Sequence, residues 1–324
     1  MNERLFHTFI RIAGALVASV MLLHATSIDP QCSSTLTNMA VVGGSSTSFC
    51  VSDYGWSNGW FATGAPGDYP SNTSINLLGD SGQAISYTLG GTTYTAWITP
   101  LADGRHTNSD FTIVTPVTGT NTPVTIGGTT YTPGTGSQVS SVVTDGRIDI
   151  TIVSTDVNNN LLQTFTVTNE TSQTLTNINF LEYFNYFPYG AGNQTSGTLS
   201  YQTVPTLENT SVYGLWANGT YGTAGFIRSG GVCGGVGTSG CTTPNAYQIG
   251  TPSSVVQSVN YGSLLDGTTS ASNDASGALS WDVSNLNLGQ GGSQAFTVEL
   301  VPEPETIALL LIGLAGIYVG RRKF

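Results

Sequence analysis

The chain has 324 residues, only 8% of them charged, and its nineteen acidic residues outnumber eight basic ones to give a net charge of −11. An acidic surface repels phosphates and anionic lipid headgroups, which excludes nucleic acid as a partner. At 39% hydrophobic and 10% aromatic residues the chain can bury a sizeable core, unlike a disordered chain.

The first 27 residues have the pattern of a secretory signal peptide. Arg4 and Arg11 precede an apolar run over residues 12–23, and Ala25 and Ser27 supply the small residues that a signal peptidase reads. We predict export through the secretion translocon and cleavage near Ser27. An uncleaved anchor is the weaker alternative, because twelve apolar residues are too few for a favoured permanent span.

The predicted exported body, residues 28–300, has three arginines, no lysine and sixteen acids, a net charge of −13. All four cysteines lie in it, and an even number in an oxidising compartment predicts two disulfides. Three connectivities are possible; we favour Cys32 with Cys50 and Cys233 with Cys241, since short loops close first. A zinc site is the alternative, but the cysteine spacing fits no common zinc pattern, so we predict no metal and no cofactor.

Residues 32–72 are rich in turn-forming residues and carry several aromatic ones. Their exposed rings could stack on sugars, which makes this segment the candidate carbohydrate contact through Tyr54, Trp56, Trp60 and Tyr69. The competing interpretation is that these aromatics plug one end of a small core, and it is the stronger of the two.

From residue 84 onward, alternating apolar and polar residues predict antiparallel strands. Gly90-Gly91 and Gly127-Gly128 each separate two short β-rich arms, and Asp145-Gly146 separates residues 139–144 from 147–154. Further strands are predicted at 162–168, 175–187, 198–204, 211–217, 224–228, 255–261, 278–283 and 294–300. No segment of the body has a convincing helical period, so we predict an all-β, sandwich-like fold.

The most aromatic segment is 180–189. A period of two places Phe180 and Phe184 on one face and Leu181 and Tyr183 on the other, so both faces are largely apolar. This pattern is typical of a central strand covered on both sides, or of one with an exposed ligand-binding face. The covered strand is the favoured interpretation.

Catalytic residues are not evident in the body. His106 is its sole histidine and lies in a turn-like segment. Glycoside hydrolysis needs only two carboxylates, which Glu170, Glu182 or Glu208 could supply, but sequence spacing does not test this. Asp156 begins a polar stretch that starts like a calcium loop but lacks its glycine and its final acid, so we interpret it as a hairpin tip.

The last 24 residues, 301–324, contain three parts in a fixed order. Pro302, Glu303 and Pro304 form a rigid extended tripeptide; an apolar run over residues 306–320 predicts a short transmembrane helix; and a basic cluster ends the chain at Arg321, Arg322 and Lys323. Because positive residues stay on the cytoplasmic side, the body is predicted to lie outside the inner membrane.

This tail resembles the PEP-CTERM sorting signal of exported proteins in Gram-negative bacteria that make exopolysaccharide. The resemblance implies that a membrane-embedded exosortase recognises the Pro302-Glu303-Pro304 motif and removes the tail, so that the protein is held transiently in the inner membrane and then reaches the cell surface or the medium. Glu305 departs from the family pattern, which more often has a small or hydroxylated residue there.

Together these features predict a secreted all-β protein with a structural or adhesive, non-enzymatic role in the extracellular polysaccharide or biofilm matrix. The first alternative is a carbohydrate-binding module, and the second is a secreted glycan hydrolase.

Overall fold

The computed structural model describes residues 39–43, 47–62, 75–76, 78–101, 105–126, 129–133, 136–157, 160–186, 198–205, 211–218, 224–228, 244–264, 267–268, 276–283 and 286–302. These residues form four β-sheets and one helix, and every strand pair among them is antiparallel except β17 with β18. The prediction of an all-β fold is therefore confirmed.

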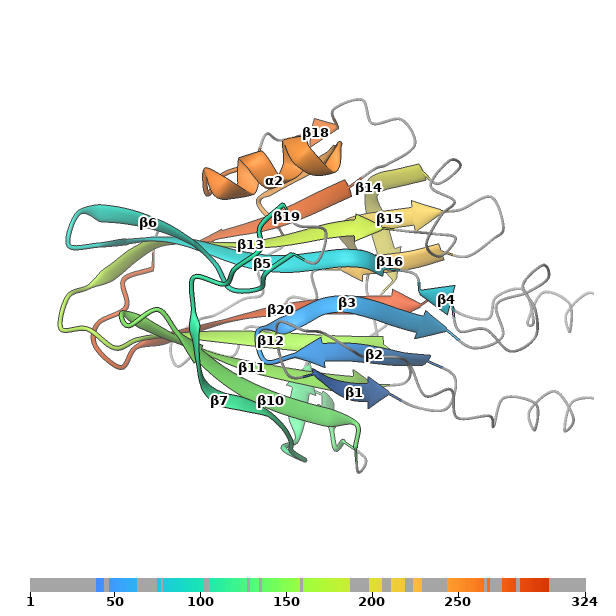
Figure 1. The fold of residues 1–324 in the computed structure, drawn as a ribbon, viewed down its shortest axis with the longest axis horizontal. Coiled ribbons are helices and arrows are strands. Elements are labelled where there is room, and N and C mark those ends of the chain that lie inside the picture. Colours follow the sequence, from blue (N-terminus) through green and yellow to red (C-terminus); the bar gives the residue numbers. More distant parts are fainter. Residues whose placement is uncertain are drawn as a thin grey trace, which may run out of the picture.

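Two large sheets make up most of the molecule (Figure 1). The eight-stranded sheet has the order β14 (Thr198–Pro205), β15 (Ser211–Asn218), β16 (Ala224–Arg228), β20 (Ser293–Pro302), β12 (Asn160–Asn169), β11 (Ile148–Val157), β10 (Gln138–Thr144) and β7 (Thr112–Gly119). The six-stranded sheet has the order β18 (Gly267–Thr268), β17 (Ala246–Gly250), β19 (Ser276–Val283), β13 (Leu175–Tyr186), β5 (Leu78–Leu89) and β6 (Thr92–Trp97).

The two remaining sheets are smaller. One has the order β1 (Met39–Gly43), β2 (Thr47–Ser52), β3 (Gly55–Ala62) and β4 (Ile75–Asn76), and the other pairs β8 (Val124–Ile126) with β9 (Thr129–Tyr131). Phe49 and Val51 of β2 are buried in the same core as residues of the two large sheets. The four-stranded sheet therefore contributes to the closure of that core.

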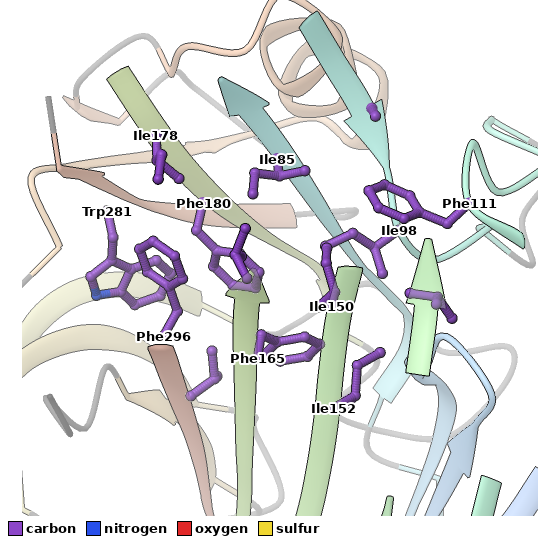
Figure 2. Packing of buried hydrophobic residues seen from close by; sticks show 14 of the residues in the cluster. Ile85, Ile98, Phe111, Ile150, Ile152, Phe165, Ile178, Phe180, Trp281 and Phe296 are labelled. Carbon is purple, nitrogen blue, oxygen red and sulfur yellow. The ribbon is translucent and has the colours of Figure 1, made fainter. Parts of the chain in front are cut away.

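The two large sheets pack face to face through aromatic side chains. The Phe180 ring of β13 lies 5.0 Å from the Phe165 ring of β12 and stacks on Phe296 of β20, also at 5.0 Å (Figure 2). Ile150 and Ile152 of β11 line the same core, as the period of two predicts. The body is thus a β-sandwich held by an apolar layer between its sheets.

Strand β13 is covered on both faces, as its sequence predicts. It lies between β19 and β5, with Phe180 and Phe184 in the core between the sheets. Leu181 and Tyr183 pack on the other side, in a second buried cluster with Val255 of helix α2.

Helix α2 (Pro252–Asn260) corrects the sequence analysis, which predicted a strand at 255–261. The Thr251 side chain caps the helix by accepting a hydrogen bond from the Ser254 N–H, and Pro252 stands in its first turn. Val255, Val256 and Val259 face the six-stranded sheet. These caps and the burial of one face outweigh the strand preference of β-branched residues.

The hairpins form where the sequence predicts them. Leu89 pairs with Thr92 across Gly90 and Gly91, whose φ angles of 59° and 84° suit a tight turn that only glycine adopts freely. Val157 pairs with Asn160, which confirms the polar hairpin tip.

The Asp145 hairpin is tied to the opposite sheet. The Asp145 carboxylate accepts hydrogen bonds from the backbone N–H groups of Arg147 and Ile148, from the Arg147 guanidinium at 2.7 Å and from the Tyr87 hydroxyl. Tyr87 belongs to β5, and the Arg147 guanidinium lies 4.1 Å above the ring of Tyr94 in β6. One turn therefore joins the β10–β11 hairpin to the β5–β6 hairpin.

Other predicted boundaries were wrong or incomplete. Much of 32–72 forms strands β1 to β3 rather than loops, and β7 and β17 were not predicted. Glycine, serine and asparagine make up half of β3, and its strand state depends on pairing with β2.

Several predictions fall outside the described residues: the signal peptide with Ala25 and Ser27, the tail over 303–324, and Cys32, Cys233 and Cys241. Cys50 lies in β2, but its side chain is also outside the description. In the part of the chain that the structure describes, no helix is long and apolar enough to cross a bilayer.

The aromatic layer makes the first prediction. Phe180→Ala should lower the free energy of unfolding by about 3–5 kcal/mol, because it removes a fully buried ring and leaves a cavity between the sheets. Urea unfolding followed by tryptophan fluorescence measures this. The control Thr92→Ala, at an exposed position on β6, should change it by less than about 0.5 kcal/mol; equal losses would contradict the assignment of the layer.

Candidate functional site

The first candidate site is the end of strand β20, where the sorting motif begins. Pairing of β20 with β12 ends at Leu300, opposite Leu161, but pairing with β16 continues through Val301 to Pro302, opposite Gly225. The strand thus runs two residues past the predicted body boundary at residue 300. Glu303, Pro304, Arg321, Arg322 and Lys323 lie outside the described residues.

A second candidate is the outward side of the eight-stranded sheet over β10, β11 and β12, which we call the hydroxyl face. It consists of nine half-buried residues in three cross-strand rows: Ser140, Val153 and Thr164; Val142, Thr151 and Thr166; Thr144, Asp149 and Thr168. Their neighbours along each strand point into the core.

Hydroxyl groups predominate on the hydroxyl face. Six of its nine residues carry a hydroxyl group, and Asp149 is the single charged one. At its edge toward β20 the Oγ1 atoms of Thr164 and Thr297 are 3.1 Å apart. The Thr144 hydroxyl donates a 3.0 Å hydrogen bond to the Ile148 carbonyl. Paired strands lie about 4.8 Å apart and alternate residues about 6.8 Å apart along a strand, so the other hydroxyls form a regular array.

The aromatic candidates are only partly described. Tyr54 packs against the main core; its carbonyl accepts a 2.7 Å hydrogen bond from Thr99, and burial, followed by the nearby Asp53, raises the pKa of its hydroxyl. Trp56 and Trp60 lie in β3, paired with Val51 and the buried Phe49 of β2. Their side chains, and Tyr69 entirely, lie outside the description. The carbohydrate-contact prediction is thus not tested.

His106 is half-buried and packs against Trp97 of the second buried cluster. Its ring stacks on Trp97 at 5.0 Å, and its Nε2 lies 3.8 Å from Asp110 Oδ2. Partial burial lowers the pKa of the imidazole despite the opposing effect of Asp110. Trp97 in turn donates a 2.7 Å hydrogen bond to Asn260, at the end of α2. These contacts give the histidine a packing role, in keeping with the interpretation as a turn residue.

Glu182 lies inside the sandwich. It is fully buried on β13, where Gln83 Nε2 donates a 2.7 Å hydrogen bond to its Oε1. Gln83 Oε1 accepts from the Thr99 hydroxyl. Within the described structure Glu182 Oε2 has no hydrogen-bond partner. Burial raises the pKa of this carboxyl well above its usual range, and the bond from Gln83 offsets only part of that effect.

A matching polar pair lies in the facing sheet. Gln163 of β12 is fully buried and donates a 2.9 Å hydrogen bond to Ser154 of β11. The rings of Phe165 and Phe180 are in contact. Gln163 is two residues from Phe165 on β12, and Glu182 is two residues from Phe180 on β13. A buried polar layer therefore lies beside the aromatic layer. The alternation of β13 suggested an inward position 182, but no sequence pattern identified its partners.

Comparison with known proteins gives one direct match. Residues 300–323 match the family model for the PEP-CTERM protein-sorting motif. No curated protein matches the sequence.

Three solved structures are similar in shape at low identity. A polysaccharide lyase has a TM-score of 0.40 at 11% identity, a bacterial glucoamylase complexed with acarbose 0.43 at 13%, and a putative aldose 1-epimerase from Escherichia coli K12 0.40 at 10%. Each alignment covers 82% of this chain, but only 32% of the lyase and 34% of the glucoamylase, against 99% of the epimerase. Likenesses this weak support no statement about the chemistry of this chain.

The matched motif defines the class: the chain carries a PEP-CTERM sorting signal, which supports an exosortase-sorted surface protein. The chain is a PEP-CTERM protein, whose sorting signal begins within the last strand of a β-sandwich.

The buried acid gives the second prediction. Below the pKa of Glu182 in the unfolded chain, both states hold the proton. As the pH rises above that value the unfolded chain releases its proton first, so stability falls until the raised folded-state pKa is reached. Glu182→Gln removes this loss, and its melting temperature should exceed that of the wild type at pH 8 but not at pH 4.

Thermal melts from pH 4 to pH 9 measure the effect. Glu170→Gln, at an exposed position between β12 and β13, is the matched control and should follow the wild-type curve. A Glu182→Gln curve parallel to the wild type would show that the carboxyl titrates as an exposed one does.

Proposed function

We propose that this protein is a non-enzymatic structural or adhesive component of the extracellular polysaccharide matrix, and that it holds polysaccharide on its hydroxyl face. The observation that carries the proposal is the regular array of hydroxyls on a rigid sheet, in a protein that is sorted to the cell surface.

The negative charge of the protein favours a neutral polysaccharide over an anionic one. The predicted body has a net charge of −13, and the hydroxyl face adds one carboxylate, Asp149, without any cation. Anionic chains would be repelled. A neutral, hydroxyl-rich chain instead finds donors and acceptors at short, regular intervals, and many weak contacts along a repeating polymer add up to useful retention.

The positions of the ionisable side chains support a role without catalysis. Glu182 is enclosed between the sheets and His106 is stacked on Trp97, so both groups act in packing. A glycan hydrolase, the second alternative, would use two carboxylates that converge on a substrate. The carbohydrate-binding module, the first alternative, would use the aromatic residues around β3.

The third prediction concerns the hydroxyl face. Thr166→Lys in its middle row should weaken binding of the purified mature protein to the host's own exopolysaccharide by about tenfold or more, equivalent to about 1.4 kcal/mol, because a long side chain lifts the polymer from the array. Pull-down on immobilised polysaccharide measures this. Thr92→Lys, at an exposed position on β6, is the matched control and should bind as the wild type does.

Two outcomes would favour the alternatives. Loss of binding in Trp56→Ala and Trp60→Ala, with Thr166→Lys unaffected, would assign a carbohydrate-binding module around β3. Release of reducing sugar from the polysaccharide by the wild-type protein would assign a hydrolase.

A further inference from the structure

Among the residues that the structure describes, the end of β20 pairs with a neighbouring strand on one side only. Four residue pairs join β20 to β16: Arg228 with Glu299, Ile227 with Leu300, Phe226 with Val301, and Gly225 with Pro302. The last two have no counterpart in β12, whose pairing with β20 stops at Leu300. Val301 and Pro302 therefore depend on β16 for their place in the sheet.

The final pair is also intrinsically weak. Pro302 lacks a backbone N–H, so its carbonyl is the only backbone group it can contribute to the ladder with Gly225. Strand β16 has five residues and is itself held by β15 on its other side. Opening of the last two pairs leaves the rest of β20 in place between β12 and β16.

The sorting signal follows without a linker. The motif match begins at residue 300, and the apolar run begins at Thr306. Four residues beyond Pro302 span at most about 14 Å when extended, so the unprocessed protein carries its sheet close to the membrane. An enzyme embedded there meets a motif whose first residue still pairs with β16.

Recognition of the motif competes with that pairing. Enzymes that process peptides commonly bind them as extended strands through backbone hydrogen bonds. Antiparallel pairs alternate between hydrogen-bonded and non-hydrogen-bonded, so one of Val301 and Pro302 directs its backbone groups at β16, and those groups are not free while the pairs are closed. An extended substrate and a closed sheet therefore use the same groups.

We propose that the exosortase takes the motif only from a form in which Val301 and Pro302 have separated from β16, so that closure of this end of the sheet and removal of the tail exclude each other. After processing, the shortened chain end pairs with β16 again and completes the sheet.

The pairing of β20 with β16 also bears on where the exosortase cuts the chain. A cut before Val301 would remove two of the four pairs that join β20 to β16, whereas a cut after Pro302 keeps all four. The bond broken is thus a peptide bond beyond Pro302. Its carbonyl carbon passes to water or to an amine acceptor, and the proton that the acceptor loses goes to the amino group of the departing tail.

The test is a disulfide that locks the pairs. Phe226→Cys with Val301→Cys places two cysteines at paired positions, where the Cα separation of antiparallel neighbours suits a disulfide. In the full chain, expressed in its exosortase-containing host, unprocessed precursor should accumulate several-fold over wild type, and adding a reductant should restore processing. Immunoblots of precursor and mature forms measure the ratio.

Matched controls separate locking from other effects. Thr164→Cys with Thr297→Cys joins β12 to β20 four positions earlier and should leave processing unchanged. Val301→Cys alone should also be processed normally; accumulation of its precursor would overturn the proposal, because damage to the motif would then explain the block.

A loosening variant tests the same idea without a disulfide. Gly225→Pro removes the N–H of the residue opposite Pro302 and should speed processing. Wild-type processing rates in both the locked and the loosened proteins would overturn the proposal. Mass spectrometry of the mature C-terminus should find a last residue at or beyond Pro302, and an end before Val301 would also overturn it.

Discussion

The fold depends on the contact between the two large sheets. Phe180 meets Phe165 and Phe296 from the facing sheet, and this aromatic layer fixes the separation and the alignment of strands from distant parts of the chain. With so few charged residues in the chain, apolar burial supplies the main driving force. The Asp145 hairpin adds a polar tie at one end of the same interface, through Tyr87 and Arg147.

The polar layer beside the aromatic one works against stability and in favour of a unique arrangement. Burying Glu182 and Gln163 is unfavourable unless their groups are paired, and each leaves one oxygen without a partner among the described residues. The hydrogen bonds to Gln83 and Ser154 tie neighbouring strands together within each sheet. A sheet shifted by one residue would break these bonds and turn the carboxyl outward.

The packing inside the sandwich determines which residues lie on its outward side. Because the inward residues of β11 and β12 are locked in the core, the alternate ones form a regular hydroxyl face. Strand β20, which lies between β16 and β12 inside the eight-stranded sheet, is also the strand that leads into the sorting signal. Pro302 therefore belongs both to the folded sheet and to the sorting signal.

The sequence by itself determined the linear features of this protein. The sorting signal, the hairpins at Gly90-Gly91 and Asp145-Gly146, and the two apolar faces of β13 depend on residues close together in the chain, and local patterns are enough to recognise them. The tertiary structure alone decided that residues 252–260 form a helix over the second face of β13, that Glu182 meets Gln83, and that Pro302 lies opposite Gly225. Each of these depends on pairing or packing between segments far apart in the sequence, which no local period encodes.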